Sequence, residues 1–153
     1  MDININICSG RHIIEDWLNI DHRSQIEGVI EWKWGDPLPV EDNSASKMMI
    51  SYGIMYAPKE NYVEHLKDCY RALKSGGLLV IKEDDDRKRV WKPVGTKHFT
   101  GTVRSTSNEP EMKGLMEEAG FTVSDTYPEE FEPLLDNHRS ARKNSYILTG
   151  HKL

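Results

Sequence analysis

The stretch ININICSGRHIIEDWLNID at residues 3–21 decides the fold. Its first five residues alternate isoleucine with asparagine, which predicts a strand, and Cys8-Ser9-Gly10 ends the alternation. A second apolar run follows and ends at Asp21. A strand that runs into a loop of small residues places backbone N–H groups at the carboxyl edge of a parallel sheet, where a nucleotide can approach closely. An acid at the end of the next strand is placed to accept hydrogen bonds from a ribose diol. The stretch therefore predicts a cofactor that contains a ribose.

Three blocks of the sequence resemble class I S-adenosylmethionine-dependent methyltransferases, in particular small type-11-like members that begin almost at their first strand. The first block is INICSG at 5–10 with DWLNID at 16–21. The second is PLPVEDNSAS at 37–46, and the third is RALKSGGLLVI at 71–81. The blocks stand in the order and at the spacing of that family and cover roughly the first 85 residues. The resemblance implies S-adenosylmethionine as the cofactor.

The resemblance also implies which residues bind that cofactor, by their match to the family's motifs. They are Asn6, Cys8, Ser9, Gly10, Asp21, His22, Trp34, Asp36, Ser51 and Tyr52. In this group Asp21 is the expected ribose ligand, and Asp36 is the carboxylate nearest to an adenine amino group. Trp34 is open to two interpretations: it contacts adenine, or it packs with Trp32 as part of an amphipathic strand.

Several positions depart from the family's pattern. Cys8 replaces the first glycine of the loop, and Ser46 replaces the aspartate that usually opens the fourth strand. Met55-Tyr56 stands in place of a common Glu-His. These changes leave a second interpretation open, in which a degenerate methyltransferase fold binds a ligand or partner without catalysis.

Length and composition predict one domain over residues 1–153 and a soluble globular protein. The chain is 37% hydrophobic and 29% charged, and it has no apolar run of membrane-spanning length. Its formal charge of −5 argues against a large nucleic-acid interface. Cys8 and Cys69 have no metal-type spacing and fit a reducing cytoplasm. The oligomeric state stays open.

The rest of the pattern predicts an α/β fold: a Rossmann-like, seven-stranded, mostly parallel sheet with an antiparallel last strand and few flanking helices. Only one or two helical turns fit between the first two strands, at residues 11–16. Asn108 with Glu111 predicts a capped helix that Gly120 ends. The other predicted elements are strands at 29–32, 48–50, 78–81, 121–123 and 145–149 and a helix from about 58 to 74, which Ser75-Gly76-Gly77 would end.

Residues 82–107 show no periodicity and leave the carboxyl end of the fifth strand. A loop this long is usually functional or disordered, and its charge blocks are also typical of a solvated surface. We predict that it is mobile without ligand and closes over the pocket when cofactor and acceptor bind, with Trp91 and Phe99 closing it and His98 brought near the methyl group.

Methyl transfer from a sulfonium needs a positioned nucleophile in a dry pocket, and a general base only for some acceptors. The candidate catalytic residues are His98, Glu83 and His138, with Asp84 as a further acid, and each is equally readable as a surface or packing residue. The sequence has no zinc-type histidine spacing, nucleophile elbow or phosphate loop. It therefore favours a methyltransferase that acts on a small-molecule or sugar-like acceptor.

Overall fold

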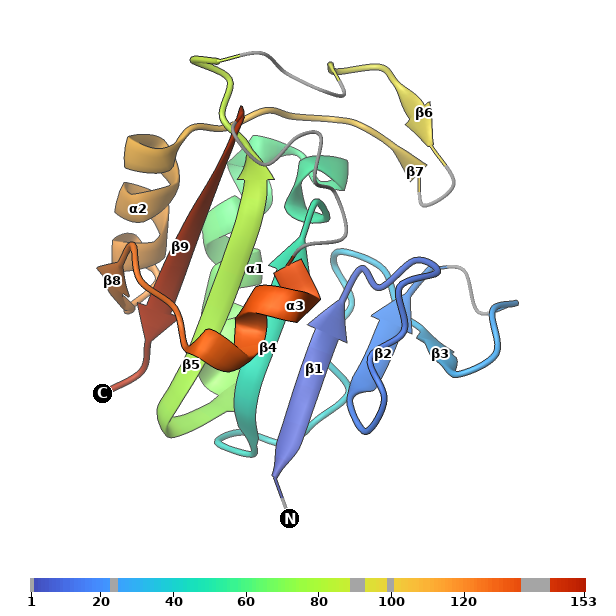
Figure 1. Cartoon of the computed structure of the whole chain (residues 1–153), viewed down its shortest axis with the longest axis vertical. Coiled ribbons are helices and arrows are strands. Elements are labelled where there is room, and N and C mark those ends of the chain that lie inside the picture. The colour runs from blue at the N-terminus through green and yellow to red at the C-terminus, as the bar shows by residue number, and fades with distance from the viewer. Residues whose placement is uncertain (1, 23–24, 89–92, 99–100, 136–143) are drawn as a thin grey trace.

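A computed structural model of the chain describes residues 2–22, 25–88, 93–98, 101–135 and 144–153. One seven-stranded sheet runs through it in the order β3-β2-β1-β4-β5-β9-β8 (Figure 1). Its strands are β1 (Ile3–Ile7), β2 (Leu18–Asp21), β3 (Val29–Glu31), β4 (Ala45–Ser51), β5 (Leu73–Asp84), β8 (Thr122–Ser124) and β9 (Ser145–His151). Strands β1 to β5 pair in parallel, and β9 pairs antiparallel with both β5 and β8. The predicted Rossmann-like sheet with an antiparallel last strand is confirmed.

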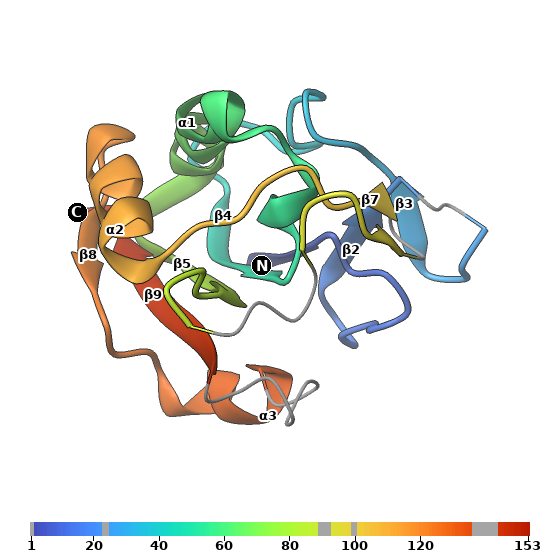
Figure 2. The same ribbon diagram turned by 90° about the horizontal axis from the view of Figure 1, so that it is seen from above.

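Helices cover the two faces of the sheet unequally. Helices α1 (Tyr62–Ala72) and α2 (Glu109–Glu118) lie on one face. In the described part of the chain, the helices on the other face are the one-turn η3 (Glu129–Phe131) and the short α3 (Glu132–Leu135) (Figure 2). Asn108 caps α2 by accepting a hydrogen bond from the Glu111 N–H at 3.1 Å, as the capping pattern predicts. Two further one-turn helices, η1 (Ile54–Tyr56) and η2 (Lys59–Asn61), follow β4.

The alternation of residues along the strands places separate core clusters on the two faces of the sheet. Ile5 and Ile7 of β1 point toward α1 and α2 and are fully buried there. Val80 of β5 points to the opposite face and packs with Phe131. β5 is therefore apolar on both sides, as the uninterrupted run at 78–81 predicts for a central strand.

Two buried asparagines fold the short connection between β1 and β2. The Asn19 side chain accepts from the Ile14 N–H and donates to the carbonyls of Ile14 and Trp17, each at 3.0 Å. Asn6 Nδ2 donates to Asn19 Oδ1 at 2.9 Å and to the His12 carbonyl at 2.8 Å. Residues 11–16 form turns and no helix. The backbone groups that a helix would pair are satisfied here by side-chain amides.

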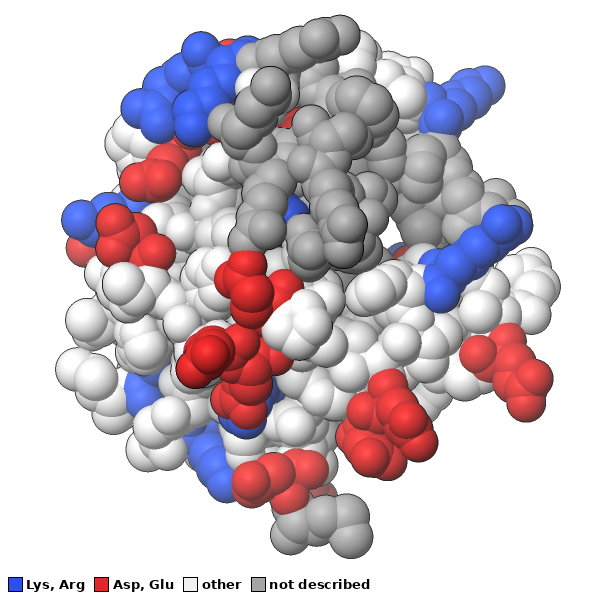
Figure 3. Space-filling view, in the orientation of Figure 1, with Lys and Arg blue, Asp and Glu red and all other residues white. Residues whose placement is uncertain are grey.

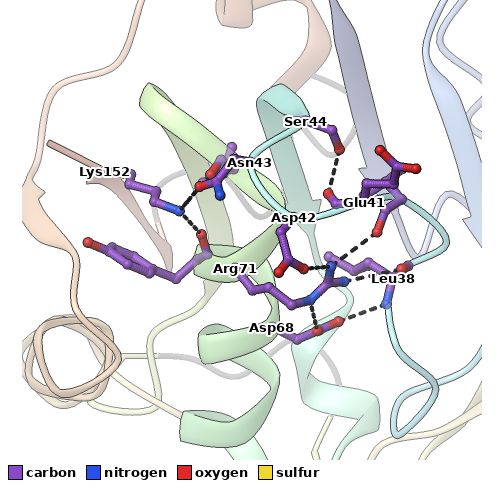
Figure 4. Close-up of polar contacts among 11 residues, drawn as sticks. Leu38, Glu41, Asp42, Asn43, Ser44, Asp68, Arg71 and Lys152 are labelled. Carbon is purple, nitrogen blue, oxygen red and sulfur yellow. Dashed lines mark hydrogen bonds and ion pairs between the residues drawn. The ribbon is translucent and has the colours of Figure 1, made fainter.

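Arg71 joins two of the blocks that carry the family resemblance (Figure 4). Its guanidinium donates to the carbonyls of Leu38 and Val40 and pairs with Asp42 at 2.8 Å and Asp68 at 2.7 Å. Asp68 in turn accepts from the Leu38 N–H at 2.7 Å. The loop before β4 and the end of α1 are therefore one hydrogen-bonded unit, and this part of the motif is scaffold.

The predicted helix at 58–74 is too long at both ends. The first residues form η2, and α1 ends at Ala72 because Leu73 is already extended, with φ −72° and ψ 138°. Ser75-Gly76-Gly77 therefore lies within β5 and does not cap the helix. Lys152 Nζ instead donates to the carbonyls of Tyr70 and Leu73 at the helix end. Lys152 thus caps the carbonyls at the end of α1, a role that we expected Gly76 and Gly77 to take.

The interpretation of residues 82–107 as one irregular loop is wrong in part. β5 continues to Asp84, because its charged end pairs with β9 on one side. Residues 93–98 and 101–107, which we call the strap, contain the hairpin of β6 (Lys97–His98) and β7 (Gly101–Thr102). Trp91 and Phe99 lie outside the described residues. Closure on ligand binding stays a prediction.

The Asn19 network yields a test of how the first two strands are held. Asn19→Ala removes four hydrogen bonds at a buried site and should lower the free energy of unfolding by about 2–4 kcal/mol. Asn4→Ala is the matched control. Asn4 lies on the same face of β1 as Asn6, and its Oδ1 atom has no hydrogen-bond partner among the described residues. It should cost less than about 1 kcal/mol in urea unfolding followed by circular dichroism. Equal losses in the two variants would refute the role of Asn19.

Candidate functional site

A cavity of about 340 Å³ lies at the carboxyl edge of the sheet, where β1 and β2 end. The strap crosses above this edge (Figure 2) and supplies one wall. The opposite wall comes from the loop after β1, the end of β2 and the segment after β3. The lining residues are Cys8, Asp21, His22, Trp32, Lys33, Trp34, Tyr56, Pro58, Gly101, Thr102 and Arg104.

Asp21 holds the floor of the cavity together. One carboxylate oxygen accepts from the Gly10 N–H at 2.8 Å, and the other accepts from the His22 N–H at 2.7 Å. The His22 ring lies 3.0 Å from that second oxygen. Asp21 is only 2% exposed, so its charge is stabilised by these backbone donors. It ties the loop after β1 to the end of β2.

The loop after β1 has a tight left-handed backbone. Cys8 has φ 60° and Gly10 has φ 53°, a region that glycine enters without strain and that costs other residues about 1–2 kcal/mol. Between them, Ser9 is 5% exposed and its hydroxyl has no hydrogen-bond partner among the described residues. A buried polar atom without a partner is costly, so a ligand that bonds to it would relieve that cost.

Cys8 presses against the loop after β4. A Cβ atom placed on Gly53 would lie 2.6 Å from the Cys8 Cβ, so only glycine fits there. Cys8 Sγ lies 3.7 Å from the Gly53 carbonyl oxygen. Burial, with the nearby charges of Asp21 and Glu83, raises the pKa of the Cys8 thiol well above its ordinary value. The group is therefore a neutral packing thiol and not a thiolate nucleophile.

Trp34 separates the cavity from a second one of about 270 Å³. Its indole N–H donates to the Gly53 carbonyl at 3.1 Å, and its ring lies on the His65 ring at 4.8 Å between centroids. Trp32 meets Trp34 edge-on, also at 4.8 Å. Both tryptophans line both cavities, and Asp36 lines only the second.

The sequence profile of the ubiE/COQ5 methyltransferase family matches residues 13–92, more than half of the chain. The chain belongs to this family. It is 31% identical over 106 residues to the demethylmenaquinone methyltransferase of Staphylococcus epidermidis, a match that covers 55% of this chain and 43% of that enzyme. The chain thus spans less than half the length of this relative.

Solved structures share the fold at low sequence identity. One is a SAM-dependent methyltransferase of Thermotoga maritima described as a possible histamine N-methyltransferase, with TM-score 0.66, 17% identity and coverage of 100% of this chain and 83% of that one. Another is a SAM-dependent methyltransferase of Archaeoglobus fulgidus, with TM-score 0.63, 16% identity and coverage of 97% and 85%. Membership of the ubiE/COQ5 family implies S-adenosylmethionine as the cofactor.

The residues at the cavity fit the nucleoside part of that cofactor. Asp21 offers a carboxylate for a ribose diol, and Trp34 and Tyr56 offer aromatic surface. The Ser9 hydroxyl, which has no hydrogen-bond partner among the described residues, marks a further position beside the cavity where a polar ligand atom would be stabilised. Cys8, which lines the cavity, lies in contact with Gly53 where the loops after β1 and β4 meet.

The structure gathers only some of the predicted site residues. Cys8, Asp21, His22 and Trp34 line the larger cavity together, and Ser9 and Gly10 lie in the loop beside them. Asn6 lines neither of the two cavities, because both of its amide hydrogens are bound within the fold. Ser51 ends β4 outside the lining.

Tyr52 has a structural setting distinct from the cavity. It has φ 53°, and its hydroxyl lies 2.8 Å from the Ser145 hydroxyl. The ring packs with Met55 and Val103 beneath the strap. Burial raises the pKa of Tyr52 to about 12, so the phenol stays protonated at neutral pH.

Of the candidate catalytic residues, only Glu83 has a described side chain. It is 2% exposed, and its carboxylate accepts from the Met55 N–H at 3.3 Å. It does not line the larger cavity. His98 lies in β6, with a side chain that is not described, and His138 lies outside the described residues. Asp84, the further acid, is buried next to Glu83.

Sequence reasoning missed the residues that the strap and η1 bring to the cavity. Arg104, Thr102 and Gly101 come from a segment without periodicity, and Tyr56 was noted only as a departure from the family's pattern. Arg104 is held in place by its N–H, which donates to the Met55 carbonyl at 2.8 Å. A long-range backbone bond of this kind leaves no local signal in the sequence.

Charges on the face seen in Figure 3 form separate groups of both signs. Within the described residues, no group of three or more histidine, cysteine and acidic residues is arranged to hold a metal ion. Within the same residues, no helix has the length and hydrophobicity to cross a membrane.

Cys8 offers a test of the loop geometry. Cys8→Gly should leave the free energy of unfolding within about 1 kcal/mol of the wild type, because relief of the left-handed strain offsets the lost packing. Cys8→Val should cost about 2 kcal/mol or more, because a branched side chain is strained at φ 60° and crowds Gly53. Urea unfolding of both variants measures this difference. A Cys8→Gly protein less stable than Cys8→Val would contradict the assignment.

Asp85 anchors the segment that leads into the strap, and its stabilisation should depend on pH. It accepts from the Arg87 side chain at 2.7 and 2.9 Å and from the Glu109 N–H at 3.3 Å. The hydrogen bonds from Arg87 lower the pKa of Asp85 to about 2. Because the folded pKa lies below the unfolded value, this stabilisation is present above about pH 4 and is lost as the pH falls toward 2.

Asp85→Asn should therefore be less stable than the wild type by about 1–2 kcal/mol at pH 7, with the gap closing between pH 4 and 2. The exposed Asp125→Asn is the control and should show no such gap. Thermal unfolding across this pH range gives the comparison. A gap that does not change with pH would exclude the carboxylate charge as its cause.

Proposed function

We propose that the protein is an S-adenosylmethionine-dependent methyltransferase that acts on a small-molecule acceptor. The observation that carries the proposal is Asp21, a buried carboxylate at the carboxyl edge of the sheet that lines a cavity in a chain of the ubiE/COQ5 family. The unpartnered hydroxyl of Ser9 beside it supports a polar ligand at the same place.

The residues around the cavity take different parts in this proposal. Asp21 accepts from the ribose hydroxyls, and His22 flanks it. Trp34 and Asp36 contact the base, and Ser9, Gly10 and Cys8 line the turn beneath the methionine part. Ser51 at the end of β4 and Tyr52 after it take the side of the methyl group. Asn6 acts indirectly, by holding the β1–β2 connection.

The cofactor supplies a methyl group that is already activated by its sulfonium charge. The chain then has to position the acceptor and exclude water. Glu83, buried near the end of β5, is the described candidate for a general base toward a hydroxyl acceptor. His98 and His138 remain candidates from the sequence.

Size and charge support a small acceptor over a macromolecule. The strap covers the cavity and leaves about 340 Å³, and the chain is acidic overall. The relative from S. epidermidis is named for demethylmenaquinone, which makes a quinone-type ring one acceptor to test, and a sugar-like hydroxyl is the other. Both cysteines are free thiols, which supports action in a reducing cytoplasm.

One observation favours a second candidate, a non-catalytic binding protein. Cys8 and Trp34 both contact the Gly53 carbonyl, and the loops after β1 and β4 touch. A cleft closed in this way would admit a nucleoside or another small ligand without placing a methyl group near an acceptor.

Calorimetric titration with S-adenosylmethionine and S-adenosylhomocysteine separates these candidates when it is combined with a methyl-transfer assay on both acceptor types. Binding with transfer supports the enzyme, and binding without transfer to either type supports the second candidate. Asp21→Asn keeps the size of the side chain but removes its charge. It should weaken binding about 10- to 150-fold, since charged hydrogen bonds contribute about 1.5–3 kcal/mol.

Asp42→Asn is the matched control, because it makes the same charge change at an exposed position that pairs with Arg71. It should bind as the wild type does. An unchanged dissociation constant in Asp21→Asn, with the fold intact by circular dichroism, would remove Asp21 from the site.

A further inference from the structure

The cofactor cleft is divided in two. Asp21 lines the larger cavity and Asp36 lines the smaller one, and the pair Trp32 and Trp34 forms the partition between them. A nucleoside that bonds to Asp21 through its ribose and to Asp36 through its base must pass through this partition. One of the two tryptophans has to move for both contacts to form together.

Trp32 is held more firmly than Trp34. Trp32 is 4% exposed, belongs to the main core and donates its indole N–H to the Asp36 carbonyl at 3.0 Å. Trp34 is half-buried, and its indole N–H donates to the Gly53 carbonyl at 3.1 Å. It also packs against the edge of the main core and against the rings of Trp32 and His65, and rings can slide past one another.

His65 provides a second position for the Trp34 indole. Its Nε2 atom is buried and has no hydrogen-bond partner among the described residues, and its ring lies 4.8 Å from that of Trp34 with 33° between the planes. Burial lowers the pKa of His65, which keeps the ring neutral at neutral pH with one nitrogen able to accept. The N–H that leaves Gly53 thus has an acceptor close by in the smaller cavity.

Removal of Trp34 from Gly53 also frees a carbonyl inside the cleft. Gly53 lies against Cys8, so its oxygen stands where the loops after β1 and β4 meet. Once vacated, that oxygen can accept a hydrogen bond from a donor group of the bound molecule. The closed and open positions of Trp34 therefore exchange one hydrogen bond for another and expose an acceptor for the ligand.

We propose that Trp34 is a gate in this cleft: its indole bridges to Gly53 in the free protein and swings toward His65 when the cofactor binds. The gate rests on the proposed function, because the occupant it admits is S-adenosylmethionine or its demethylated product. It makes Trp34 a specificity-determining residue, since only a ligand whose binding energy displaces the indole can reach Asp21 and Asp36 together.

Fluorine NMR of the intact chain labelled with 5-fluorotryptophan tests the gate. The sequence has four tryptophans, and single Trp→Phe variants assign their resonances. Addition of S-adenosylhomocysteine should shift the Trp34 resonance strongly. The Trp17 resonance should stay in place, because Trp17 packs edge-on against Phe131 at 5.9 Å on the other face of the sheet.

Affinity gives the second readout. Trp34→Phe removes the indole hydrogen bonds of both positions and leaves a smaller ring between the two cavities, so it should bind S-adenosylhomocysteine at least as tightly as the wild type and up to about 10-fold more tightly. Trp34→Tyr, with a hydroxyl at a different place, is a second variant in case Phe does not fold, and Trp17→Phe should bind as the wild type does. Binding that leaves the Trp34 resonance unmoved, or that weakens in Trp34→Phe, would overturn the gate and leave the proposed function standing. The absence of binding to both the wild type and the Trp34 variants would overturn both.

Discussion

The site depends on how β1 is joined to β2. Residues 11–16 are too few to form a covering helix, so buried side chains must satisfy the backbone of the connection. The Asn19 side chain forms hydrogen bonds with both the N–H and the carbonyl of Ile14, and Asn6 in the neighbouring strand donates a hydrogen bond to Asn19. Because the end of β2 is held in this way, Asp21 meets Gly10 at 2.8 Å and shapes the floor of the cavity. The side-chain amides of Asn6 and Asn19 thus satisfy backbone groups that a helix would pair internally.

A side chain at position 8 explains why the loops after β1 and β4 lie in contact. A glycine at position 8 would leave space between the loops after β1 and β4, and Cys8 fills it. The opposing residue is Gly53, which alone permits that approach, and Trp34 bonds to its carbonyl. The loop after β1 therefore pairs a left-handed backbone with close packing, and any ligand that extends toward β4 has to displace a side chain rather than enter an open groove.

The sequence predicted the sheet well because each strand carries its own signal. Alternation in β1 and the apolar run of β5 are local patterns, and the capped start of α2 at Asn108 is equally local. The candidate site was predicted only in part. Asp21 and Trp34 follow from strand ends, whereas the separation of Asp36 by a tryptophan ring is a matter of side-chain packing. Arg104 reaches the cavity through backbone bonds to a segment about fifty residues away, which no local pattern encodes.

The family match covers strands β2 to β5 of the sheet but not the strap that lines the cavity. The match covers residues 13–92 and includes the loop that Arg71 binds at Leu38 and Asp42, which is a scaffold contact. The strap begins at residue 93, beyond the match, and supplies one wall of the larger cavity. The family match therefore covers most of the parallel part of the sheet and of the edge where the cofactor is expected to bind. The strap residues that line the cavity, Gly101, Thr102 and Arg104, lie outside the match, so their contribution has to be understood from the chemistry of this chain itself.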